Sequence, residues 1–320
     1  MNTVYMNRID NLFANYDQLK SDFAWEGHLA RWLVALGHTM GDKSLNTNQI
    51  KEIKQYIKQN TGMFSPFKGT PLFPLSGLVS ANAANPKGEV DRMINNYDVM
   101  KRAGFKQTTY LPTALYTLAT VYEGSDFSGH ADRAMTVYQD MKKNHPFLTS
   151  GDDYALAVLL ADSQQPLSKI EEIYEALRAA GFGATNGLQM MSHMLTLSEE
   201  SVAVLVSRCV EINNQLKANK LRISSMYYAA IALIALMGDH LIDDLIEVAS
   251  HMKKSKHGKW LDKGMNVLMA SAIIASDRIQ NGEKDLATAP IQVSIQAVII
   301  AQQVAVIAAV SASTSAAASS

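Results

Sequence analysis

The sequence predicts an all-α protein, a right-handed α-solenoid of about seven helix pairs of the tetratricopeptide or HEAT kind. No stretch shows the apolar–polar alternation of strands. Seven amphipathic segments each end in an apolar anchor followed by a basic residue, and these anchors lie 38, 43, 41, 36, 39 and 36 residues apart. A period near forty is typical of stacked helix pairs, because one pair cannot bury its own apolar face. The anchors are Leu19, Ile57, Met100, Met141, Leu177, Leu216 and Met252.

The end of each first helix is predicted from residues that stop helices. Gly104 and Gly181 follow basic last turns, and a glycine there can take the left-handed conformation that ends a helix. Phe105 and Phe182 come next and are expected to fold back on the last turn. In the fourth unit Pro146 replaces the glycine, because proline cannot continue a helix.

The second helix of each pair is more apolar and richer in small residues, which predicts burial on most sides. The predicted second helices are 28–36, 72–81, 110–122, 154–161, 188–197, 226–237 and 264–275. Turn-rich stretches separate the pairs at 41–46, 82–88, 123–129 and 276–283. Tyr97, Tyr138 and Tyr174 recur at similar places in successive units, where they face either the seam between pairs or a ligand.

The C-terminal part differs from the rest because Asp285 is its last charged residue. We therefore divide the chain into a repeat array, 1–285, and an uncharged helix with a Ser/Ala tail, 286–320. Residues 291–310 are apolar enough to be considered as a membrane span. However, Gln292, Gln296 and Gln303 share one arc of a helix, which favours a capping helix at about 290–311 that packs on the array or on a partner chain.

Composition limits the classes of partner. With 29 basic and 30 acidic residues the chain lacks the basic excess of a general nucleic-acid binder. The lone cysteine, Cys209, excludes an internal disulfide and fits a reducing compartment. No apolar run at the start is long enough for a signal-peptide core, so we expect a cytoplasmic protein. A protein or peptide is the expected partner, and no cofactor is predicted.

The most enzyme-like cluster in the sequence is His145 with Asp152 and Asp153. An imidazole and two carboxylates could bind a metal or share a proton. Helix capping explains the same residues, because His-Pro ends one helix and the aspartates begin the next. The chain contains none of the glycine-rich phosphate loops or nucleophile elbows of common enzymes.

An aromatic, proline-bearing turn at 62–69 is the strongest candidate for binding. Phe64, Pro66 and Phe67 lie in it, and Trp25 and Trp32 lie one unit earlier. If these side chains are exposed together, they form a binding surface. If they are buried, the turn closes the end of a core.

Two stretches together resemble a pentatricopeptide unit, a family that reads RNA one base per repeat. They are 138–143 (YQDMKK) and 153–156 (DYAL). That code needs a more regular array than spacings of 36 to 43 residues provide. RNA is therefore not a predicted partner.

Three motifs extend a second resemblance over nearly the whole chain. They are 61–69 (TGMFSPFKG), Gly104-Phe105 with 110–112 (YLP), and 143–150 (KNHPFLTS). With the Ala/Gln-rich C-terminus, they resemble an uncharacterised bacterial family, domain of unknown function 4003. The resemblance implies a helical protein of Gram-positive bacteria and assigns no activity or functional residue.

Together these observations predict a non-catalytic scaffold or adaptor that binds a protein or peptide. Two alternatives stay open. One is a metal-dependent enzyme with its site at His145, Asp152 and Asp153, and the other is a protein that associates with membranes through 291–310.

Overall fold

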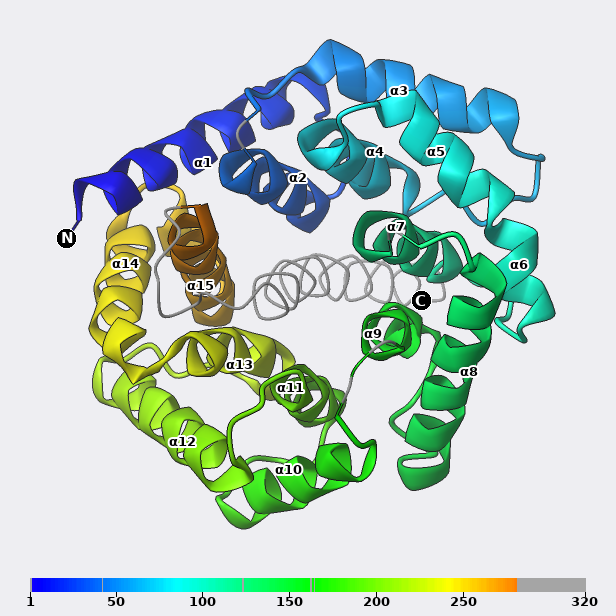
Figure 1. The fold of residues 1–320 in the computed structure, drawn as a ribbon. Helices are drawn as coiled ribbons and strands as arrows, with labels where there is room; N and C mark the ends of the chain where they lie inside the picture. Colours follow the sequence, from blue (N-terminus) through cyan, green and yellow to red (C-terminus); the bar gives the residue numbers. More distant parts are fainter. Residues whose placement is uncertain (1, 42, 123, 162, 164, 281–320) are drawn as a thin grey trace, which may run out of the picture. The chain divides into compact units, whose positions relative to one another are not determined.

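The computed structural model describes residues 2–41, 43–122, 124–161, 163 and 165–280, which form helices joined by turns, with no β-strand among them (Figure 1). The all-α prediction is therefore confirmed. The described residues fall into two compact units. Unit 1 contains those within 2–9, 140–149 and 163–280, and unit 2 those within 10–139 and 150–161. The predicted C-terminal helix and the possible membrane span at 291–310 lie outside the described residues.

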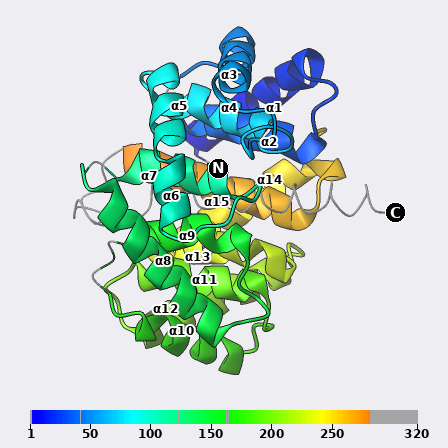
Figure 2. The same cartoon turned by 90° about the vertical axis from the view of Figure 1, so that its right-hand side faces the viewer.

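Unit 2 is built from helix pairs in chain order. Within it α2 packs on α4, α4 on α3 and α5, α7 on α4, α5 and α6, and α9 on α7 (Figure 2). The helices are α1 (Thr3–Asp22, in this unit from residue 10), α2 (His28–Met40), α3 (Thr47–Asn60), α4 (Leu72–Asn82), α5 (Pro86–Asn95), α6 (Tyr97–Arg102), α7 (Leu111–Val121), α8 (Phe127–Asn144, in this unit to residue 139), the 3-10 turn η1 (Gly151–Asp153) and α9 (Tyr154–Leu160).

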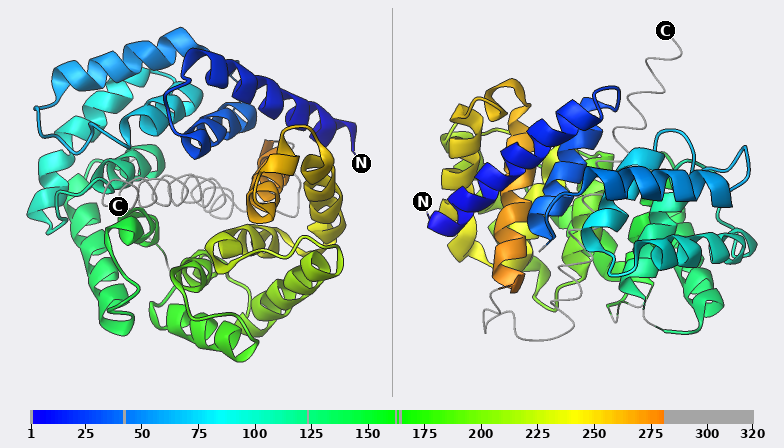
Figure 3. Two further views of the ribbon diagram at one scale, coloured as in Figure 1. Left: turned by 180° about the vertical axis from the view of Figure 1, so that it is seen from behind. Right: turned by 90° about the horizontal axis from the view of Figure 1, so that it is seen from above.

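Unit 1 shows the same order in two layers. α10, α12 and α14 contact one another in sequence on one side, and α11, α13 and α15 do so on the other (Figures 1 and 3). Each helix of the first layer also packs on the helix that follows it. The elements are α10 (Ser168–Ala179), α11 (Asn186–Thr196), α12 (Val202–Ala218), η2 (Ser225–Tyr227), α13 (Tyr228–Met237), η3 (Asp239–Leu241), α14 (Ile242–Lys254), η4 (Gly258–Trp260) and α15 (Lys263–Gln280).

The seven anchors of the sequence repeat are core residues. Each lies on the first helix of a pair, and none is more than 2% exposed. In α3, for example, Ile50, Ile53 and Ile57 form the buried stripe while most of the other side chains meet solvent. Burial of one large aliphatic side chain contributes about 1.5–3 kcal/mol, so the recurring anchors are a main source of cohesion.

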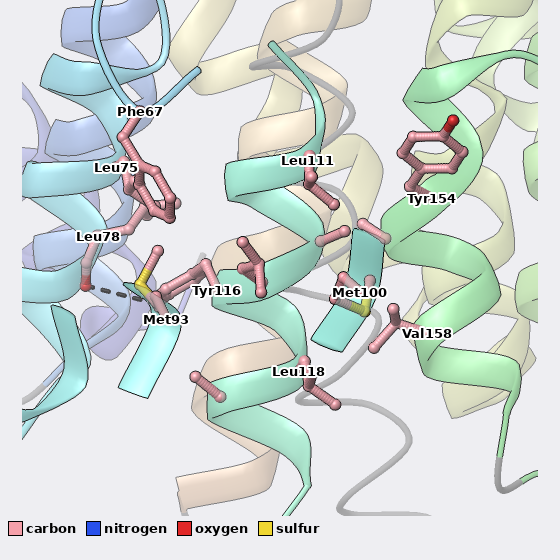
Figure 4. Packing of buried hydrophobic residues seen from close by; sticks show 14 of the residues in the cluster. Phe67, Leu75, Leu78, Met93, Met100, Leu111, Tyr116, Leu118, Tyr154 and Val158 are labelled. Carbon is pink, nitrogen blue, oxygen red and sulfur yellow. Dashed lines mark hydrogen bonds between the residues drawn. The ribbon is translucent and has the colours of Figure 1, made fainter. Parts of the chain in front are cut away.

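The second helices are buried almost all round, as their composition predicts. α13 consists of alanine, isoleucine, leucine and methionine after its first tyrosine. In α4, Gly77 allows close contact, because a Cβ there would lie 2.4 Å from a methyl group of Val34 in α2. Figure 4 shows the core around α4, α7 and α9, where the Tyr116 hydroxyl donates to the Leu78 carbonyl at 3.5 Å.

Three first helices end in the same hydrogen-bonded turn. Gly104 and Gly181 have φ of 109° and 95°, and the amides of Phe105 and Phe182 donate to carbonyls five residues earlier at 3.1 Å. This pattern is a Schellman motif, in which a left-handed residue lets the chain satisfy the last carbonyls. After α12 the left-handed residue is Lys220, with φ of 60°, and Leu221 follows it into the core. The glycine signals are confirmed, whereas the strained lysine was not predicted.

Several predicted boundaries are wrong: α2 continues to Met40, beyond the predicted 28–36, and α5 and α8 begin at Pro86 and Phe127, within the predicted turns 82–88 and 123–129. The first helix of the third pair is divided into α5 and α6 at Asn96, whose side-chain amide donates to the Arg92 carbonyl. The predicted turn at 276–283 begins too early, because α15 continues to Gln280. Its polar residues are kept helical by partners distant in sequence: Asp277 lies 3.4 Å from Arg8, and Arg278 lies 3.3 Å from Asp244.

Candidate binding pocket

The connection between α3 and α4 in unit 2 lines an open pocket of about 460 Å³. One wall is the end of α3 with the loop itself, and the other comes from α5, α6 and the turn after α6. The lining residues are Asn60, Thr61, Gly62, Met63, Phe64, Ser65, Pro66, Phe67, Ile94, Tyr97, Asp98 and Gln107.

The loop is held by successive tight turns. The amide of Ser65 donates to the Gly62 carbonyl at 3.1 Å, and that of Lys68 donates to the Ser65 carbonyl at 3.0 Å. Gly69, at φ of 83°, then turns the chain toward α4. Backbone hydrogen bonds therefore fix the loop locally.

The loop sends its large apolar side chains in opposite directions. Phe67 is 2% exposed and belongs to the core cluster of unit 2. Met63 and Phe64 are 81% and 89% exposed and stand at the rim of the pocket. Single exposed apolar side chains are common, but apolar side chains that gather beside a hollow are typical of binding sites.

Tyr97 supplies the polar feature of the opposite wall. Its ring centroid lies 6.1 Å from that of Phe67, and the Lys101 ammonium lies 5.3 Å from its centroid. Its hydroxyl is buried and has no hydrogen-bond partner among the described residues. Burial raises the pKa of Tyr97, so the phenol stays protonated at neutral pH. A buried hydroxyl without a partner costs free energy.

Gln107 and Asp98 add further polar groups to the wall that faces the loop. The Gln107 side-chain amide donates to the Phe64 carbonyl at 3.5 Å, which links the loop to the opposite wall. Asp98 is the one carboxylate in the lining, and it lies 3.8 Å from Lys101. The lining contains no histidine or cysteine.

The structure separates the aromatic residues that the sequence grouped together. Phe64, Pro66 and Phe67 line the pocket, and Trp25 and Trp32 do not. Trp32 is 2% exposed and stacks on Tyr16 with 3.8 Å between centroids. It is a core residue rather than part of a surface, because α2 is a buried second helix. Trp25 is exposed in the turn between α1 and α2.

The residues of the possible enzyme site have local partners in their own units. In unit 1, His145 Nε2 lies 3.0 Å from Glu171 Oε2, and its ring packs against Tyr174 at 4.3 Å. In unit 2, Asp153 accepts from the Ser150 amide at 2.9 Å in a capping box, and Asp152 accepts from the Ser150 hydroxyl. Among the described residues, no three histidine, cysteine or acidic side chains are grouped to hold a metal.

One family model matches the chain over residues 15–304 and is described as a protein of unknown function, DUF4003. The chain belongs to this family. A relative from Bacillus subtilis (strain 168), described as uncharacterized protein YeaA, is 29% identical over 313 residues, which cover 94% of this chain and 93% of that protein. No solved structure matches the chain.

The family match includes the pocket loop, the glycine turns and the anchors of the sequence repeat. The resemblance inferred from the 61–69, 104–112 and 143–150 motifs is therefore confirmed. Within the part of the chain that the structure describes, no helix is long and apolar enough to cross a membrane.

Proposed function

We propose that the protein is a non-catalytic binding protein, a solenoid of helix pairs that holds an apolar side chain of a partner protein in the pocket under the α3–α4 loop. The exposure of Met63 and Phe64 at the rim of that pocket is the observation that carries the proposal. A fixed loop that leaves a phenylalanine 89% exposed loses hydrophobic free energy unless a partner covers it.

The repeat order supports the solenoid part of the proposal. Every first helix contributes one buried anchor, and unit 1 stacks its first and second helices in separate layers. Arrays of this kind grow by adding pairs and spread their contacts over several repeats. They bind other proteins along their surfaces rather than through one catalytic cleft.

The pocket dimensions support an apolar anchor as the occupant. A volume of about 460 Å³ falls within the range of ligand pockets and suits one or two large side chains. Phe64, Phe67, Ile94 and Tyr97 supply apolar walls.

The test compares two exposed aromatic residues of unit 2. Tagged wild-type protein, Phe64→Ala and Trp25→Ala are used to recover partners from lysate of the native bacterium. Trp25 is 77% exposed and lies outside the pocket, so its variant controls for general surface hydrophobicity. The recovered protein is then purified, and its affinity for the three forms is measured by calorimetry.

The proposal expects a stoichiometric partner that Trp25→Ala retains and Phe64→Ala binds at least about tenfold more weakly, as for a hot-spot aromatic residue. Equal binding by both variants contradicts the proposal. A partner whose affinity depends on Trp25 and not on Phe64 would move the binding surface to the α1–α2 turn.

A further inference from the structure

A second surface lies in unit 1, where α12 and α14 end. The turns that follow these helices, 217–227 and 253–263, contain many exposed cations and one exposed carboxylate, Asp262. The exposed cations are Lys217, Lys220, Arg222, Lys254, Lys256, Lys259 and Lys263. The chain as a whole has a net charge of −1, so this concentration of positive charge is local.

Two contacts show that these turns are neighbours. The Lys253 ammonium donates to the Lys220 carbonyl at 3.1 Å, joining the end of α14 to the end of α12. Gly264, which follows the second turn, lies against the ring of Tyr227, because a Cβ there would come 2.0 Å from it. We call this continuous surface the basic edge, residues 217–227 and 253–263.

The basic edge also exposes two large apolar side chains. Met226 is 63% exposed in η2, and Trp260 is 81% exposed in η4. The Lys259 ammonium lies 5.3 Å from the centroid of the Trp260 ring. Apolar side chains surrounded by lysines are typical of proteins that lie on membrane surfaces, where tryptophan sits at the headgroup level.

The opposite ends of the same helices carry negative charge. Asp243 lies in the first turn of α14 and Glu199 precedes α12, while their neighbours Asp244 and Glu200 are paired with Arg278 and Arg208. Both signs match the helix dipole, which favours acids at the start and bases at the end of a helix. Because the charges of two parallel helices add, the basic ends would be attracted to an anionic surface while the acidic ends are repelled.

We propose that the basic edge binds the surface of an anionic lipid bilayer. The negative surface potential of such a bilayer attracts lysines, and each lysine close to the surface strengthens binding about fivefold. Met226 and Trp260 would enter the interface between headgroups and acyl chains. Single-stranded nucleic acid fits less well, because it is held by aromatic stacking, and Met226 has no ring to stack on a base. The pocket under the α3–α4 loop plays no part in this proposal.

The test is sedimentation of the full chain with phosphatidylcholine vesicles, with and without phosphatidylglycerol. We expect binding only to the vesicles that contain phosphatidylglycerol, and weaker binding as salt is added. Lys254→Gln with Lys256→Gln should lower partitioning on the order of 30-fold, the factor that corresponds to two charges. The control is the double variant Lys51→Gln with Lys87→Gln, which lowers the net charge by the same amount. These two lysines lie near the starts of α3 and α5, outside the basic edge.

A second readout reports on Trp260 alone. In a Trp25→Phe background, Trp260 is the exposed tryptophan and Trp32 is buried, so the emission of Trp260 should shift to the blue on anionic vesicles. The Trp260→Phe variant should show no such shift. The vesicle binding that this variant retains should be lost at high salt.

Three results would overturn the proposal. Equal binding to both kinds of vesicle would remove the electrostatic basis. Binding that the paired lysine substitutions leave unchanged would assign attachment to another part of the chain, such as 286–320, which has no charge to lose. In a competition experiment, short single-stranded DNA could release the protein from the vesicles at a lower concentration than added phosphatidylglycerol vesicles do. That result would make the basic edge a nucleic-acid surface instead.

Discussion

The second and fifth helix pairs begin alike and connect their helices differently. In the fifth pair, α10 ends at Gly181 and Phe182 turns straight back into the core. In the second pair, α3 is followed by the loop 61–71, which buries Phe67 and leaves Phe64 in solvent. The short connection is used for cohesion, and the additional length of the longer one forms a pocket. Residues beyond those that close the core are thus the ones available for binding.

The largest expected effect tests which aromatic residue closes the core in each pair. Phe67→Ala and Phe182→Ala should each lower the free energy of unfolding by about 3–5 kcal/mol, because both remove a buried ring and leave a cavity. Phe64→Ala should change it by less than about 0.5 kcal/mol. Urea unfolding of the three variants measures the difference. If Phe64→Ala lowered the free energy of unfolding as much as Phe67→Ala, both rings of the loop would stabilise the fold, and the loop would have no part free for binding.

The two pairs also differ in what their second helices bury. α11 carries His193, which is fully buried, whereas α4 has no titratable side chain. Burial lowers the pKa of His193 to about 4, with a smaller contribution from the nearby His145. Its Nδ1 contacts the Gln189 carbonyl, and its Nε2 has no hydrogen-bond partner among the described residues. The folded state therefore holds a neutral imidazole.

The sign of the pH effect follows from that lowered pKa. The unfolded state takes up a proton below a pKa near 6.5, whereas the folded state resists protonation until about pH 4. The contribution of neutral His193 to the free energy of unfolding is thus fully present above pH 6.5. It falls by about 3 kcal/mol as the pH drops toward 4. Unfolding measured from pH 8 to 4 should show this slope. His193→Gln should remove its own share and leave that of His38, whose pKa burial also lowers to about 4. An unchanged slope in the variant would assign the effect to other groups.

A third prediction separates close packing from loop flexibility within the fifth pair. Gly187→Ala should cost about 1–3 kcal/mol, because its Cβ would lie 1.8 Å from the Ser225 carbonyl oxygen and force backbone apart. Gly183→Ala is the matched control, since a Cβ there meets nothing within 4 Å. Thermal unfolding compares the two variants. Equal melting temperatures would contradict the close contact between Gly187 of α11 and Ser225 of the basic edge.

The sequence predicted those parts of the fold that depend on local pattern. The anchors and the glycine turns were found because burial recurs with the repeat and because a left-handed residue is most easily glycine. The extension of α15 through Asp277 could not be predicted, since it depends on Arg8 at the other end of the sequence. For the same reason the sequence suggested Phe64 and Phe67 for the pocket but not Ile94 or Gln107, which the fold brings to the loop.

The smallest effect concerns the turn after α12, where the chain has a lysine at the position of Gly181. Gly181→Ala should lower stability by about 1 kcal/mol, because φ is 95° there and nothing surrounds the new methyl group. Lys220→Gly should raise stability by about 0.5–1 kcal/mol, since it relieves a side chain held at φ of 60°. Matched urea titrations give both values. If Lys220→Gly also weakens binding to anionic vesicles, the charge of the strained lysine contributes to the basic edge. If binding is unchanged, the basic edge does not use Lys220, and membrane binding does not explain the strain.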